Sequence, residues 1–361
     1  MRRAALAALI GAALLAVSSG ALAAPAGEPK AAGVPAHPEG GPVRTDRPGF
    51  APVDLPDSIA QDLRLAWALR ARVGQAYWPE WAATRPASLL LRGDPFDYFV
   101  NHPAPPGTTT AEAPLPGGPG TYHTSLHRLP YPDASWTRIE SHGGFWCVPY
   151  SFEKGRPGTR AQTAAMLAVR DFLVYQTTAG KPVWATPSDT EQVRRLRSDP
   201  DLLAWLDQEG VSLRQAVAEA DPARRAEWVH KALAAAAKAD EAAARKPDLV
   251  KTLAWLREAR RFEGSALYMR ILLEGNAAAL VQGDTAQALP GEGAAPEARQ
   301  RLWRERAAGL SDRSVTGGHL GSIGEAGAYS CVLLDMTTPG WRKRIFQADF
   351  RLSAALAKAF K

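Results

Sequence analysis

Cysteine is nearly absent from this chain, whose 361 residues include only Cys147 and Cys331. Two cysteines so far apart offer neither the paired Cys-x-x-Cys spacing of a zinc ribbon nor the cysteine density of a small disulfide-stapled scaffold. If the chain is exported, a disulfide between them is permitted. Two buried free thiols are the alternative. The sequence leaves both open, with Cys147 and Cys331 as the disulfide candidate.

Two common catalytic motifs are missing as well. The chain has no G-x-x-x-x-G-K-[ST] phosphate loop and no G-x-S-x-G nucleophile elbow. The segment Gly317–Ser322 (GGHLGS) comes nearest to an elbow, but the residue two before Ser322 is Leu320. We interpret this segment as a glycine-rich turn, with a flexible active-site loop as the alternative.

Histidine is sparse, and only His123 and His127 have the i,i+4 spacing that lets a helix present two ligands to one metal. Here the surrounding glycines and prolines favour strands and turns. Four residues of a strand span about 13 Å, which is too far for shared ligation without a bend. We therefore expect exposed strand histidines and no metal bound by this pair.

After residue 23 no apolar run is long enough to cross a membrane. The one long apolar run, residues 4–17, follows Arg2 and Arg3 and precedes the small-residue triplet Ala21-Leu22-Ala23. This arrangement is typical of a secretory signal peptide over residues 1–23. We expect an exported protein, periplasmic or extracellular, without a transmembrane segment in the mature chain.

The chain also lacks a basic stripe interleaved with aromatic residues. Its formal net charge is +6, but the basic residues occur in short groups, such as Arg194-Arg195, among acidic ones. Such charges are typical of solvated faces and not of a nucleic-acid-binding surface. We expect no nucleic acid partner and leave an unknown protein or peptide ligand as the partner.

Hydrophobic periodicity changes along the chain. Residues 24–56 are rich in proline, glycine and alanine and are interpreted as a disordered lead-in. Residues 57–158 form a β-rich N-terminal part, and residues 159–361 a helical part. The predicted fold class is α+β, mostly α, with a small β-rich layer packed on a helical body. Expected helices are 58–73, 161–177, 201–208, 212–220, 222–244, 246–281, 299–310, 324–336 and a terminal helix; expected strands are 87–91, 122–129, 136–140 and 145–150, with 94–101 a helical turn or a strand.

Residues 249–281 stand at the centre of this organisation, because they contain no proline and repeat apolar residues at helical spacing. Glu263 lies i+4 from Ala259 and i−3 from Ala266, so a carboxylate falls on the face expected to be buried. Burying a charge is costly unless it is paired or bound to a metal. Glu263 is therefore the first functional candidate.

Several short stretches resemble an exported bacterial family of uncharacterised, gluzincin-like (HExxH-type) metallopeptidases. They are residues 88–91 (SLLL) with 99–103 (FVNHP), 167–176 (LAVRDFLVYQ), 262–268 (FEGSALY), and 333–335 (LLD) with 339–342 (PGWR). The resemblance implies a small sheet beside a helical metallopeptidase-like body. It further implies that an H-E-x-x-H helix supplies two zinc ligands and a base, and that a later glutamate supplies the third ligand.

This sequence departs from that pattern at the zinc motif. Val169 and Leu173 take the positions of the two histidines, and Arg170 takes that of the catalytic glutamate. Aliphatic side chains cannot bind zinc. Only Glu263, at the position of the third ligand, remains, and we expect Arg170 to replace the metal as its partner, with Arg260 as the rival.

The sequence thus predicts a metallopeptidase-like protein that has lost zinc and hydrolytic activity, has no cofactor, and acts by binding or as a scaffold. One alternative is an active hydrolase that uses other residues of the same cleft, with Glu263, Tyr268, His142 or His319 in acid–base roles. His142 could also act as a base for Cys147, but closeness in sequence is poor evidence for such a pair, because catalytic partners meet in space. The other alternative is an unrelated helical binding protein of the cell envelope.

Overall fold

The computed structural model describes residues 53–92, 96–102, 111–125, 137–139, 145–151, 159–180, 189–282, 303, 321–338 and 340–361. Several predictions lie outside these residues: the signal peptide, most of the lead-in, the helix 299–310 apart from Trp303, and the side chains of His127, His142 and His319. The described residues group into two compact units. A helical unit contains residues 57–87 and those from 159 onward, and a sheet unit contains residues 53–56 and 88–151.

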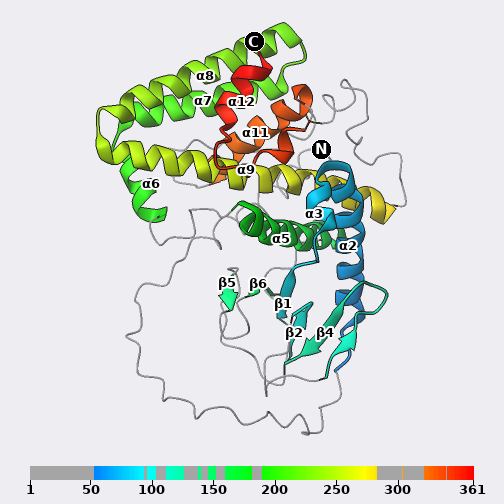
Figure 1. Cartoon of the computed structure of the whole chain (residues 1–361). Helices are drawn as coiled ribbons and strands as arrows, with labels where there is room; N and C mark the ends of the chain where they lie inside the picture. The colour runs from blue at the N-terminus through cyan, green and yellow to red at the C-terminus, as the bar shows by residue number, and fades with distance from the viewer. Residues whose placement is uncertain are drawn as a thin grey trace, which may run out of the picture. The chain divides into compact units, whose positions relative to one another are not determined.

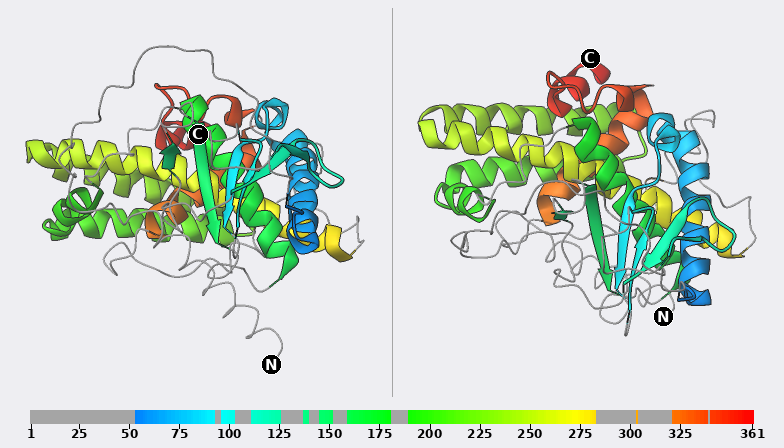
Figure 2. Two further views of the ribbon diagram at one scale, coloured as in Figure 1. Left: turned by 90° about the horizontal axis from the view of Figure 1, so that it is seen from below. Right: turned by 60° about the horizontal axis from the view of Figure 1, so that its bottom comes forward.

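The described residues of the sheet unit form a mixed sheet of six strands in the order β3-β4-β2-β1-β6-β5. The central strand β1 pairs antiparallel with β2 and parallel with β6. Strands of this sheet lie side by side in both views of Figure 2. The strands are β1 (Ser88–Arg92), β2 (Asp97–Val100), β3 (Ala113–Pro114), β4 (Thr121–Thr124), β5 (Thr137–Ile139) and β6 (Phe145–Ser151).

The two central strands form because their apolar residues are buried in succession. Leu90 and Leu91 of β1 and Phe99 of β2 are each at most 1% exposed, and such a continuous apolar run is typical of a strand covered on both faces. Of the two alternatives for residues 94–101, the strand is therefore the one observed. The expectation of exposed histidines is wrong for His123, which is buried. His123 lies on β4 and is paired with Phe99 of β2, and β4 is flanked by β2 on one side and by β3 on the other.

The helical unit contains the long helices expected from the sequence, with a few differences. Residues 200–218 form one continuous helix where the sequence indicated two. Gly210 lies inside it, because a single glycine costs a helix only about 1 kcal/mol relative to alanine. Helix α6 was not anticipated. The helices are α2 (Asp57–Tyr77), α3 (Pro79–Ala83), α5 (Arg160–Gly180), α6 (Asp189–Arg197), α7 (Pro200–Ala218), α8 (Pro222–Ala244), α9 (Pro247–Gln282), α11 (Gly321–Thr337) and α12 (Leu352–Ala359), with a 3-10 turn η3 (Trp341–Lys343).

Helix α9 is the centre of this unit, since α5, α8 and α11 all pack against it. Figure 1 shows α7 and α8 running side by side along the same flank, and they pack on each other. Leu256, Phe262 and Leu272 of α9 are fully buried. Because α9 is covered by several helices, its buried surface is wider than one amphipathic stripe.

These elements confirm the predicted fold class, α+β and mostly α, with a small sheet from the N-terminal half. Helices α2 and α3, which precede the strands in the chain, are grouped with the helical unit. Within the ranges that the structure describes, none of the helices is both long and apolar enough to cross a membrane.

Candidate functional site

The helix that the resemblance aligns with a zinc-binding helix is α5, and its three motif positions are not equally buried. Val169 is 5% exposed and belongs to the core, whereas Arg170 and Leu173 are half-buried. Helix α5 packs against α9, which carries Glu263. The two helices implied by the resemblance are thus neighbours, with two apolar residues and one arginine at the motif positions.

Arg170 carries a positive charge next to another one. Burial and the nearby charge of Arg270 on α9 lower the pKa of Arg170 to about 10, so the guanidinium remains charged near neutral pH. Among the ion pairs formed by described residues, none joins Arg170 to Glu263, and the expected pair is therefore not formed. The rival Arg260 pairs with Glu209 of α7 at 2.5 Å.

Glu263 is half-buried and lies against α11, and is not on the fully buried face where the sequence placed it. A Cβ atom built at Gly324 of α11 would stand 3.7 Å from Glu263 Oε2. The next residue, Gly264, lies where the backbones of α9 and α11 come close to each other. A Cβ atom there would come within 2.4 Å of the backbone of Gly327, and a Cβ atom at Gly327 would reach 1.9 Å from the carbonyl oxygen of Arg260. Glycine at 264 and 327 is thus required for α9 and α11 to cross.

Ser265 of the same motif fixes α5 to α9. Gln176 of α5 donates from Nε2 to Ser265 Oγ at 2.6 Å and to the carbonyl oxygen of Phe262 at 3.1 Å. The hydroxyl of Ser265 in turn donates to carbonyl oxygens of its own helix. Gln176 and Ser265 are both buried, so these bonds form where water does not compete for the partners.

Tyr268 closes the motif in a buried polar cluster. Arg342 donates from Nη2 to Tyr268 Oη at 2.6 Å and forms an ion pair with Asp335. Trp303 donates to Asp335 Oδ2 at 3.2 Å and stacks on Tyr268 with ring centroids 4.9 Å apart. Burial raises the pKa of Tyr268 well above its ordinary value, so the phenol stays protonated. With no exposed surface, Tyr268 holds the fold together here and does not face a ligand.

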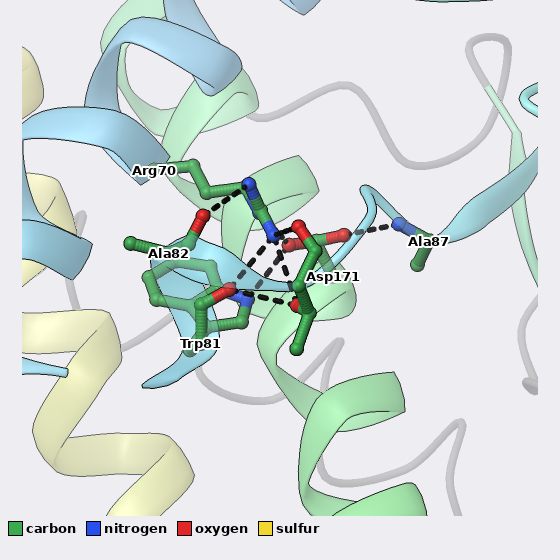
Figure 3. A network of polar contacts seen from close by, with 6 residues as sticks. Arg70, Trp81, Ala82, Ala87 and Asp171 are labelled. Atoms are coloured by element: carbon green, nitrogen blue, oxygen red, sulfur yellow. Dashed lines mark hydrogen bonds and ion pairs between the residues drawn. The ribbon is translucent and has the colours of Figure 1, made fainter. Parts of the chain in front are cut away.

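A second buried ion pair lies between Arg70 of α2 and Asp171 of α5 (Figure 3). Arg70 Nε donates to Asp171 Oδ2 at 2.6 Å, and the indole of Trp81 donates to the same oxygen at 2.7 Å. The other oxygen of Asp171 accepts the backbone N–H of Ala87. Burial raises the pKa of Asp171, and the charge of Arg70 opposes that rise.

The remaining nitrogens of Arg70 close the end of helix α3. They donate to the carbonyl oxygens of Trp81, Ala82 and Thr84, which are groups that a helix C-terminus leaves without intrahelical partners. This network therefore joins α2, α3 and α5 and leaves Arg70 occupied on every side. We interpret it as structural.

The disulfide candidate has no support from the described side chains. Cys331 of α11 is a free cysteine with no exposed surface, and burial raises the pKa of its thiol. The side chain of Cys147 lies outside the described residues, so the bridge stays a prediction. The same holds for the roles given to His142 and His319.

Sequence reasoning overlooked the two buried ion pairs. Arg70 and Asp171 are 101 residues apart in the chain, and neither belongs to a recognisable motif. Asp335 and Arg342 do lie in quoted stretches, LLD and PGWR, but their convergence with Tyr268 depends on the packing of α9 and α11. The two short motifs therefore contained residues of this cluster, but only the fold shows that these residues contact one another.

Comparison with protein-family models, with curated proteins and with solved structures gives no match for this chain.

Proposed function

We propose that this chain is an exported, metallopeptidase-like protein that has lost zinc and hydrolytic activity and acts by binding a protein or peptide, or as a scaffold. The observation that carries the proposal is the charge at the former zinc position. Arg170 remains cationic, and Arg270 is the charged group that acts on it. The guanidinium of Arg170 repels a divalent cation, and Val169 and Leu173 offer it no ligand.

The chemistry of zinc hydrolysis needs a metal-activated water and a base to accept its proton. In this chain the base position is Arg170, which cannot accept a proton near neutral pH. Tyr268, one of the alternative acid–base candidates, is fully buried and hydrogen-bonded to Arg342. These features favour binding over hydrolysis at the α5–α9 pair.

Elemental analysis of the purified protein, after incubation with excess zinc and desalting, tests the loss of the metal. We expect far less than one zinc per chain and no cleavage of an unfolded protein substrate such as casein. One tightly held zinc per chain, together with cleavage that a chelator abolishes, would overturn the proposal.

A restored motif tests the resemblance separately. The triple variant Val169→His, Arg170→Glu, Leu173→His rebuilds H-E-x-x-H on α5, and we expect it to bind about one zinc per chain. Glu263→Gln in the same background should weaken that binding by about 10- to 100-fold, because a carboxylate ligand is lost. A folded triple variant that takes up no zinc would refute the resemblance, while the zinc-free state of the natural chain would stand.

A further inference from the structure

A pocket rich in arginine lies among α7, α8, α9, α11 and α12, all within the helical unit. We call it the arginine pocket. Its charged lining residues are Arg257, Arg260, Arg261, Arg351, Glu209 and Glu258. The lining has four guanidinium groups and two carboxylates, and Arg257 is also paired with Asp240 at 2.9 Å, so the net formal charge of the cluster is +1. None of these residues belongs to the zinc-motif positions, so the inference does not depend on the loss of zinc.

Arg260 is the central feature of the arginine pocket, because it is 5% exposed and only part of its guanidinium is used. Its Nη1 pairs with Glu209 Oε2 at 2.5 Å. Its Nε and Nη2 are buried and have no hydrogen-bond partner among the described residues. These two nitrogens form the side edge of the guanidinium, whose parallel N–H groups match two oxygens of one anion. A buried donor pair of this kind is costly to leave unmade.

Among the described residues, the carboxylates that pair with the lining arginines are already engaged, and Asp240 is held by Arg257 at 2.9 Å. Glu209 is already held by Arg260 Nη1, and Glu258 pairs with Arg261 and with Arg351. Arg261 also has a buried nitrogen, Nε, that lacks a hydrogen-bond partner in the part of the chain that the structure describes. The lining thus has an excess of positive charge and an excess of donors.

The start of helix α12 adds further donors. Arg351, the N-cap residue, supplies no side-chain cap to the helix, and Leu352 and Ser353 of its first turn line the pocket. The first backbone N–H groups of a helix have no intrahelical acceptor and carry partial positive charge. They therefore favour the same kind of ligand as the free edge of Arg260.

The size of the pocket limits that ligand. The cavity volume is about 40 Å³, and one water molecule requires about 10–15 Å³ on that measure. The space thus corresponds to about three waters, which suits a single oxyanion group and is too small for a nucleotide or a peptide segment.

We propose that the arginine pocket binds a small dianionic oxyanion of the phosphate class, held by the Nε and Nη2 edge of Arg260 and by the first turn of α12. A phosphate group has oxygens for both the Arg260 edge and the N–H groups of α12, whereas a carboxylate has only two oxygens to share between them. The anion is either free in solution or the terminal group of a larger molecule that reaches in from outside.

Isothermal titration calorimetry of the full chain with inorganic phosphate, at about pH 8 where phosphate is mainly dianionic and at constant ionic strength, tests the site. We expect saturable binding at one site per chain, with acetate at least about tenfold weaker. A phosphomonoester that binds as tightly as phosphate would show that the site accepts the terminal group of a larger molecule, and one that does not bind would restrict it to the free ion. If acetate bound with the same affinity as phosphate, the preference for a dianion would be wrong. If phosphate gave no saturable heat, the proposed site itself would be wrong.

Variants locate the anion. Arg260→Met should weaken phosphate binding by about tenfold or more, since it removes a bidentate charged pair. If this variant fails to fold because Glu209 loses its partner, Ser353→Asp provides the test. It places a carboxylate of the chain itself in the lining at the start of α12, and we expect it to compete with phosphate and to weaken binding by about tenfold.

The matched control is Ala354→Asp, which adds the same charge one residue further along the same helix turn at an exposed position that does not line the pocket. We expect its phosphate affinity to stay within about threefold of the natural chain, as for a screened surface charge. If Ser353→Asp and Ala354→Asp lowered the phosphate affinity equally, the chain would attract anions only through its general charge, and the proposal would be wrong. Phosphate affinity unchanged in a folded Arg260→Met variant would also contradict it.

Discussion

The glycine of the FEGSALY stretch, Gly264, is needed because of a contact with another helix, and the residues beside it in the sequence do not indicate this contact. Gly264 and Gly327 let two helix backbones approach so closely that any Cβ atom would collide with main-chain atoms. Backbone atoms cannot move aside as the end of a flexible side chain can. Glycine at these positions is therefore a packing requirement of the α9–α11 crossing.

Gly327→Ala tests this requirement. We expect it to lower the free energy of unfolding by about 3 kcal/mol or more, because the new methyl group overpacks the crossing. Urea denaturation followed by circular dichroism measures the change.

Gly210→Ala is the matched control, since it is also a glycine in a helix but has open space beside it. It should raise the free energy of unfolding by about 0.5–1 kcal/mol, as expected when alanine replaces glycine in a helix. A loss below about 1 kcal/mol in Gly327→Ala would contradict the close crossing.

Asp199 both caps the start of helix α7 and connects it to the turn between α8 and α9. Asp199 is the N-cap of α7, and its Oδ1 accepts the backbone N–H of Leu202 at 2.9 Å. Its Oδ2 accepts from Lys246, at the turn between α8 and α9, at 2.8 Å. The hydrogen bond from Lys246, together with the capping bond, lowers the pKa of Asp199. The two interactions fix the start of α7 and join it to the turn that precedes α9.

Asp199→Ala should therefore lower the free energy of unfolding by about 0.5–2 kcal/mol at neutral pH, the usual cost of losing a cap. Asp199→Asn keeps an acceptor oxygen and should lose less.

The pH dependence of this contribution has a definite sign. The pKa of Asp199 is lower in the folded than in the unfolded chain, so its stabilisation is present above the unfolded value near 4 and is lost as the pH falls through the folded value. Denaturation at neutral pH and at about pH 3 should show a smaller difference between the natural chain and Asp199→Asn at the acid pH. A difference that grew on acidification would contradict this assignment.

The whole molecule combines a sheet unit with a helical unit whose residues come from both sides of it in the chain. Residues 57–87 and the residues from 159 onward form the helical unit, while residues 88–151 supply the strands. The helical unit is therefore complete only after the C-terminal half has been made. Before these units stand the 23 residues proposed as a signal peptide.

We predict that expression in a bacterium with a general secretion system yields a mature protein that begins at Ala24, because Ala21-Leu22-Ala23 presents the small residues that signal peptidase requires. Intact-mass measurement and N-terminal sequencing of the exported fraction check this. Replacing Ala21 and Ala23 with leucine should leave the precursor uncleaved, and a full-length natural chain confined to the cytoplasm would refute the proposal of export.

The sequence by itself determined the long helices and the fold class, because the spacing of apolar residues along a chain is a local property. Helix α8 has the bounds, Pro222–Ala244, that this spacing predicts, and α5 and α9 differ from expectation by a few residues at their ends. The sequence also showed that positions 169, 170 and 173 carry no zinc-binding set, since ligand chemistry depends on residue type alone.

Only the tertiary structure decided which side chains meet. Arg170 does not pair with Glu263, and Tyr268 belongs to a buried cluster with Arg342. Arg260 lines a pocket and has two buried nitrogens without a hydrogen-bond partner among the described residues. Each of these arrangements depends on residues from several helices, and the spacing of residues along one helix cannot specify how another helix crosses it. Burial then sets the energetic importance of each contact, because a polar group costs free energy only where packing removes its water.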